Sequence, residues 1–118
     1  MKTIESIKAE IVKLNAEYHI EFANKNWGKA WNISDTMNAL GERVLNLGYG
    51  FTFNWSDGGC DFSSSVIKEK NGDVIIDGST LLSGRLEIDI KIEKMGIGRV
   101  FEIANEYGID LKFDVFKI

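Results

Sequence analysis

The sequence predicts a single α+β domain. Its one mainly antiparallel sheet of four to five strands is covered on one face by two N-terminal helices and one short C-terminal helix. Three observations support this prediction. Residues 1–48 carry helical periodicity, whereas residues 49–118 are rich in strand patterns. Residues 86–93 alternate apolar and charged side chains at every position. Asn71 and Gly72 separate two strand patterns and form the strongest hairpin signal in the chain.

The composition is that of an ordinary globular domain. The chain has 118 residues, of which 44% are hydrophobic and 27% are charged. Its one cysteine, Cys60, excludes an intramolecular disulfide and favours a reducing compartment. No apolar run approaches the roughly 20 residues that a membrane-spanning helix needs, and residues 1–10 lack the apolar core of a signal peptide. We therefore expect a cytoplasmic protein.

The net charge of −4 is unevenly distributed. Residues 1–48 hold six basic and six acidic side chains, whereas residues 49–118 hold eight basic and twelve acidic ones. This balance disfavours direct binding of duplex nucleic acid, because phosphate binding requires a basic surface. It suits a partner protein with a basic surface, although simple solubility also explains a charge of this size.

Two amphipathic helices are expected in the first half. Apolar residues recur at helical spacing over residues 3–15. Residues 16–23 fit either a continuation of this helix or a strand, and we favour the helix. The segment that follows is expected to be irregular until Ser34, which is a good N-cap for a second helix over residues 35–47. Gly48 then suits the C-terminal end of that helix.

The second half is expected to hold the sheet and one further helix. Strand patterns cover residues 49–55, 62–70, 73–78, 86–93 and 111–116. Residues 79–85 are expected to form a loop, and residues 99–107 a helix that ends at Gly108. Because this helix separates strands 86–93 and 111–116, the two strands are candidates for parallel neighbours joined by a crossover.

Strand 49–55 is unusually aromatic. One of its faces carries four aromatic side chains, those of Tyr49, Phe51, Phe53 and Trp55. If this face meets the helices it is core, and if it faces outward it is a platform for a ligand or a partner. The opposite face is small and polar, with Gly50, Thr52 and Asn54. That difference favours the core.

Two tryptophans stand out before the second helix. Trp27 and Trp31 lie four residues apart and flank Lys29. They are either residues that close one end of the core or anchors of a protein interface, where tryptophan is enriched.

The polar segment 56–61 is the most loop-like stretch of the chain. Successive backbone N–H groups around Gly58 and Gly59 would suit an anion, but the flanking Asp57 and Asp61 would repel a phosphate unless a metal intervened. The spacing of its acidic residues and Cys60 matches no standard metal site, so a turn is the simpler interpretation. Together with the aromatic strand it forms the alternative ligand-binding set: Tyr49, Phe51, Phe53, Trp55, Asp57, Gly58 and Gly59.

The charged face of strand 86–93 is the other candidate surface. Glu87, Asp89 and Glu93 share that face, and Asp114 would extend it if the last strand were adjacent. A solvated sheet face explains the pattern simply. The sharper hypothesis is a docking surface for a basic protein, in which acidic groups speed association and block substrate phosphates.

No catalytic motif, metal set or cofactor signature supports an enzyme, so we expect neither a metal nor a cofactor. The leading hypothesis is a non-enzymatic, stoichiometric inhibitor of a nucleic-acid-processing protein, of the toxin-immunity or phage anti-defence (anti-CRISPR) type. Its expected partner-binding residues are Glu87, Asp89, Glu93, Asp114, Trp27 and Trp31. A small-molecule or nucleotide-binding protein is the alternative, and a small enzyme using Asp57, Asp61 or Cys60 is the third. A homodimer is also considered, because pairing would protect an edge strand.

Overall fold

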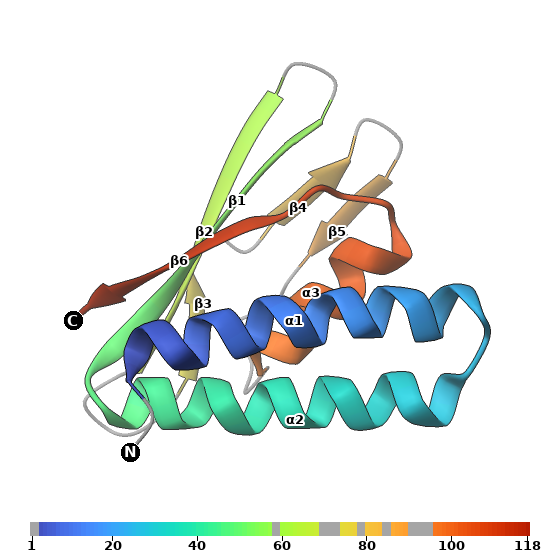
Figure 1. Cartoon of the computed structure of the whole chain (residues 1–118). Helices are drawn as coiled ribbons and strands as arrows, with labels where there is room; N and C mark the ends of the chain where they lie inside the picture. The colour runs from blue at the N-terminus through green and yellow to red at the C-terminus, as the bar shows by residue number, and fades with distance from the viewer. Residues whose placement is uncertain (1–2, 58–59, 69–73, 78–79, 84–85, 90–95) are drawn as a thin grey trace.

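The computed structural model describes residues 3–57, 60–68, 74–77, 80–83, 86–89 and 96–118. Two long helices come first, then a run of strands, a third helix and a final strand (Figure 1). In chain order the elements are α1 (Ile4–Ala23), α2 (Trp27–Asn46), β1 (Tyr49–Asp57), β2 (Cys60–Lys68), β3 (Val74–Asp77), β4 (Thr80–Ser83), β5 (Leu86–Asp89), α3 (Ile97–Glu106) and β6 (Lys112–Lys117). The predicted α+β class is confirmed.

Helix α1 is longer than the clearest part of its sequence pattern. Thr3 is its N-cap, and the Thr3 hydroxyl accepts a hydrogen bond from the Ser6 N–H at 3.1 Å. Residues 16–23 continue the helix, as favoured from the sequence, because Tyr18 extends the buried stripe of Ile7 and Ile11.

Helix α2 begins seven residues before the predicted Ser34 cap. Ser34 is buried inside the helix, so its expected capping role was wrong. The reason is that Ala30 and Ser34 continue the buried stripe of Met37 towards the N-terminus, and these small side chains do not stand out as an apolar pattern. The helix ends at Asn46 with Leu47 as its C-cap, and Gly48 follows in the expected position with a left-handed backbone, φ 89°.

The strands divide into two sheets, so the prediction of one sheet is not supported. The order β3-β2-β1-β6 forms one sheet, and β4 pairs with β5 in a separate ladder. The strand pairings of the described residues are all antiparallel. β4 lies within the predicted loop 79–85. In the described part of the chain β5 pairs with β4 and does not neighbour β6, so the suggested parallel crossover is not supported there. The Asn71-Gly72 turn and the second half of strand 86–93 lie outside the described residues.

One face of the larger sheet carries the core. Phe51 and Phe53 on β1 and Val66 on β2 are fully buried, whereas Asn54 on the opposite face is exposed. The three helices lie on the buried side in Figure 1. Alternation along β1 therefore places its aromatic face inward and its small, polar face outward.

Helix α3 packs closely on α2. The Asn38 side-chain oxygen accepts a hydrogen bond from the Gly98 N–H at 2.7 Å. Gly41 on α2 faces Ile97, and a Cβ atom at Gly41 would lie 2.8 Å from the Ile97 side chain. Glycine at position 41 therefore permits a helix contact that alanine would obstruct. The packing in this contact offsets the roughly 1 kcal/mol that a glycine inside a helix costs.

Candidate functional site

The two tryptophans in the first two turns of α2 are the largest exposed aromatic side chains in the described part of the chain. Trp27 is 42% exposed and Trp31 is 60% exposed. Both lie on a helix whose neighbouring face is buried through Ala30 and Met37. The helix therefore presents two rigid aromatic side chains to solvent, one turn apart.

The connection between α1 and α2 holds this end of the helical pair in place. The rings of Phe22 and Trp27 meet edge to face with centroids 5.2 Å apart. The Asn26 amide donates a hydrogen bond to the Glu21 carboxylate at 2.8 Å. Lys25 adopts a positive φ of 60°, which turns the chain between the two helices. The start of α2 is thus anchored to the end of α1.

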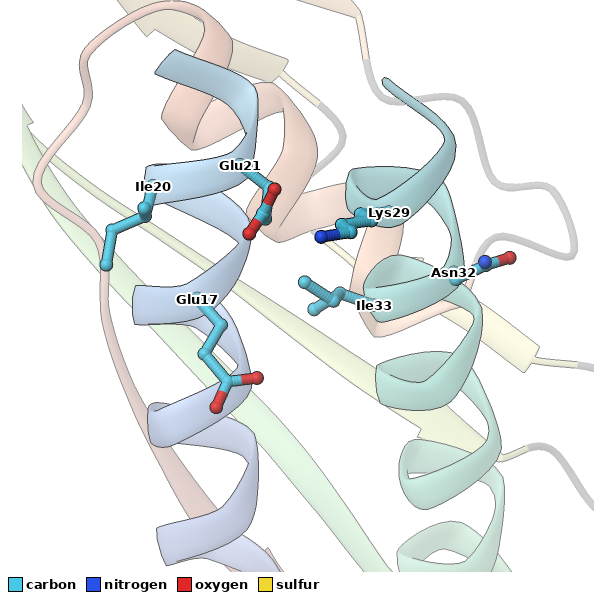
Figure 2. A pocket seen from close by; sticks show the side chains of 6 residues that line it. All are labelled: Glu17, Ile20, Glu21, Lys29, Asn32 and Ile33. Atoms are coloured by element: carbon cyan, nitrogen blue, oxygen red, sulfur yellow. The ribbon is translucent and has the colours of Figure 1, made fainter. Parts of the chain in front are cut away.

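A groove of about 380 Å³ lies between α1 and α2 near this turn. Its lining residues are Glu17, Ile20, Glu21, Lys29, Asn32 and Ile33. Figure 2 shows the side chains of Glu17 and Glu21 on α1 and of Lys29 and Ile33 on α2 in the space between the helices. Ile20 and Asn32 point away from that space in the same view.

The chemistry of the groove combines negative charge with an apolar wall. Glu17 and Glu21 lie one helical turn apart on the same face of α1, where like charges oppose each other by a few tenths of a kcal/mol. Lys29 offsets one of the two charges from the other side. A positively charged group carried on an apolar stem, such as a lysine or arginine side chain, matches this lining.

The predicted acidic surface is not assembled as the sequence suggested. Glu87 and Asp89 lie on β5, which pairs with β4, whereas Asp114 lies on β6 beside β1. The side chains of Glu87 and Asp89 are not described, and Glu93 lies outside the described residues. Asp114 instead forms an ion pair with Lys8 of α1 at 2.6 Å. That contact bridges two segments more than a hundred residues apart, which no local pattern reveals.

The aromatic strand contributes to the core. Phe51, Phe53 and Trp55 are buried, and Tyr49 is half-buried. The Phe53 ring meets the Phe101 ring of α3 edge to face at 5.6 Å. These side chains are therefore accounted for by packing between the sheet and α3.

The polar segment after the aromatic strand belongs largely to the β1–β2 hairpin. Asp57 and Cys60 face each other as the last paired residues of the ladder, and Gly58 and Gly59 lie outside the described residues. The only histidine, His19, is exposed on α1. Within the described ranges, no three His, Cys, Asp or Glu side chains gather as metal ligands would. Among the helices of those ranges, none has both the length and the apolar composition needed to cross a membrane.

Trp27 and Trp31 stand out in the sequence as candidate contact residues, whereas the groove beside them does not. The groove depends on α1 reaching Ala23 and on α2 starting at Trp27, and both limits are set by packing. The spacing of Glu17 and Glu21 was the available signal, since it places two carboxylates on one face of any continued helix.

Comparisons of this chain with protein-family models, with curated proteins and with solved structures found no match.

Proposed function

We propose that this chain is a non-enzymatic protein that binds another protein, and that it acts as a stoichiometric inhibitor of a nucleic-acid-processing protein. The observation that supports this proposal is the exposure of Trp31, 60% open to solvent on an ordered helix. Exposed tryptophans are costly in water and are enriched among the residues that dominate protein interfaces.

The contact surface that we propose consists of Trp27, Trp31 and the adjoining groove at the turn between α1 and α2. Glu17 and Glu21 give this surface two carboxylates, which complement a basic partner. Proteins that process nucleic acids carry basic surfaces for phosphates, so they are partners of the right charge. An acidic protein docked there would exclude the nucleic acid.

The proposal relocates the contact residues from the sheet to the helical pair. Asp114 is already paired with Lys8, so it is less suited to a partner than the sequence suggested. Trp27 and Trp31 remain in the contact set, and the acidic residues on β5 have no support from the described geometry.

Affinity capture from an extract of the source organism, with mass-spectrometric quantification, tests the proposal. The tagged wild-type chain is compared with the double variant Trp27→Ala/Trp31→Ala and with Leu47→Ala. Leu47 is the matched control because it is 56% exposed just after the far end of α2. We expect one protein to be retained in equimolar amount by the wild type and by Leu47→Ala. The double variant should bind it about thirtyfold more weakly, the loss expected for interface anchors.

The captured protein is then purified and its activity on nucleic acid is measured with increasing amounts of the chain. Inhibition that is complete at one equivalent supports the proposed function. Full activity at excess chain contradicts inhibition, and equal capture by all three forms contradicts the proposed surface. If no protein is retained and a nucleotide raises the Tm of the chain, the small-ligand alternative is favoured instead.

A further inference from the structure

Among the described strands, β6 lies at an edge of the larger sheet, and its one neighbour there is β1. The Ile118 N–H, just after β6, donates a hydrogen bond at 2.9 Å to the carbonyl of Gly48, the residue just before β1. The backbone of residue 118 therefore faces the β1 side. In an antiparallel ladder the backbone groups of alternate residues point to opposite sides of the strand. Even-numbered residues of β6 therefore direct their N–H and C=O groups to β1. Phe113, Val115 and Lys117 direct theirs outward.

One of these outward groups already has a partner within the chain. The Asp114 carboxylate accepts a hydrogen bond from the Val115 N–H at 2.8 Å through Oδ1. The same oxygen accepts the hydrogen bond from Lys8 Nζ at 2.6 Å. Asp114 therefore covers an edge donor of the sheet and ties that edge to helix α1.

The position of this ion pair is more informative than its strength. The Lys8 and Asp114 side chains are 32% and 71% exposed, so solvent screens their attraction and the pair adds little to folding stability. Charged side chains at a sheet edge are, however, a common means of preventing one edge from pairing with another. The Lys8–Asp114 pair has the location for that role.

We propose that the outer edge of β6 is a self-association surface, that its occupant is β6 of a second copy, and that the Lys8–Asp114 pair holds it closed. A two-fold axis through Phe113 would place the two copies of Phe113 opposite each other in antiparallel register. The same register puts Lys112 opposite Asp114 of the second copy, twice per dimer. This complementary charge on one face identifies a second copy as the occupant.

The closed and paired arrangements compete for the same groups. In the paired register the Val115 N–H faces the Leu111 carbonyl of the second copy, so it has to leave Asp114. The Asp114 carboxylate exchanges Lys8 of its own chain for Lys112 of the other. A change that removes only the Lys8 contact therefore favours pairing, whereas a change at Lys112 opposes it.

Sedimentation velocity over a range of concentrations tests this competition with three lysine substitutions. Lys8→Met keeps the side-chain stem and removes the charge, and we expect it to strengthen self-association about tenfold. That factor assumes a several-fold effect for each exposed ion pair, applied twice because a dimer has two. Lys8→Met/Lys112→Met should return the dissociation constant to the wild-type range. Lys13→Met, an exposed lysine elsewhere on α1, is the matched control and should behave as wild type.

Hydrogen exchange at the Val115 amide adds a readout for the location of the contact. In the Lys8→Met dimer this amide should exchange more slowly as concentration rises, while circular dichroism confirms that the fold is retained. Self-association of Lys8→Met that equals the wild type overturns the proposal. A Lys8→Met dimer that persists unchanged with Lys112→Met, or that leaves Val115 exchange independent of concentration, also overturns it.

Discussion

The side chain of Asn38 on α2 accepts a hydrogen bond from the backbone N–H of Gly98 at 2.7 Å, sixty residues away in the sequence. Gly98 lies in the first turn of α3, where the backbone N–H groups have no partner within the helix. Asn38 therefore does for α3 what a capping residue does, but from a neighbouring helix. The contact sets where α3 begins and how close it comes to α2.

Replacing Asn38 by alanine should destabilise the fold by about 1–3 kcal/mol. The substitution leaves the Gly98 N–H without its acceptor in a partly buried position. Chemical denaturation measures the change, and Asn32→Ala on the exposed side of the same helix is the control. Equal stabilities of the two variants would show that the Asn38 contact is unimportant.

Gly98→Ala should destabilise the chain by about 1–3 kcal/mol, the usual cost of overpacking. A Cβ atom at position 98 would collide with the Ser34 backbone carbonyl and with the Asn38 side chain. Gly28→Ala is the matched control, because Gly28 is also in the first turn of a helix and has open space around it. That control should be neutral or stabilising by up to about 1 kcal/mol. Thermal and chemical denaturation of both variants decide the matter, and a stabilised Gly98→Ala would contradict the packing described.

Phe53→Ala should destabilise the fold by about 3–5 kcal/mol, the cost of emptying a large aromatic site in a core. Phe53 is fully buried and meets the rings of Phe101 and Phe113, with centroids 5.6 and 6.3 Å away. Phe53→Leu keeps much of the volume and should lose clearly less. If Phe53 served a ligand instead, the alanine variant would lose binding while its unfolding curve stayed near that of the wild type.

Acid should release the Lys8–Asp114 contact. The pKa of Asp114 lies below its usual 3.8. The main cause is the hydrogen bond from Lys8, and the second is the hydrogen bond from the Val115 N–H. Because the folded-state pKa is lowered, the stability from this carboxylate is present above pH 3.8 and is lost as pH falls through the lowered pKa. In samples dilute enough for Lys8→Met to remain monomeric, an NMR titration of the Asp114 carboxyl carbon should show its pKa rising in Lys8→Met and unchanged in Lys13→Met. A pKa that is the same in all three forms would mean that the contact does not persist in solution.

Tyr18 should ionise only in strongly alkaline solution. Burial raises the pKa of its hydroxyl above 10.0, and the Glu102 and Glu106 carboxylates raise it further. Because the folded-state pKa is raised, the folding stability that the protonated Tyr18 hydroxyl contributes is fully present below pH 10.0. It is lost as pH rises through the raised pKa. A spectrophotometric tyrosinate titration should therefore show a late component that Tyr18→Phe removes. A titration curve of the same shape for both proteins, with the late component retained, would contradict this assignment.

The limits of the elements show where local pattern was sufficient and where it was not. The stripe through Ile7, Ile11 and Tyr18 is long enough for its period to identify α1. The start of α2 was placed too late because its buried positions there are Ala30 and Ser34, whose small side chains pack closely without appearing apolar. Strand β4 was missed for another reason, since a four-residue strand is stabilised chiefly by its partner β5.

The candidate site divides in the same way. Trp27 and Trp31 were selected from the sequence because tryptophan is rare and favours interfaces. The groove beside them was not, because Glu17 and Lys29 line the same groove only when the two helices reverse direction at Lys25. The partner of Asp114 is Lys8, and a contact between residues that far apart has no local signature.

The sequence by itself determined the α+β class, the helical first half and the inward aromatic face of β1. These follow from the period of apolar side chains, which is a local property of the chain. The tertiary structure alone decided that strands 86–89 and 112–117 lie in different sheets, that Asn38 meets Gly98, and that Lys8 meets Asp114 at a sheet edge. Those choices depend on which surfaces pack together, and the free energy of packing is a property of the whole fold rather than of any one segment.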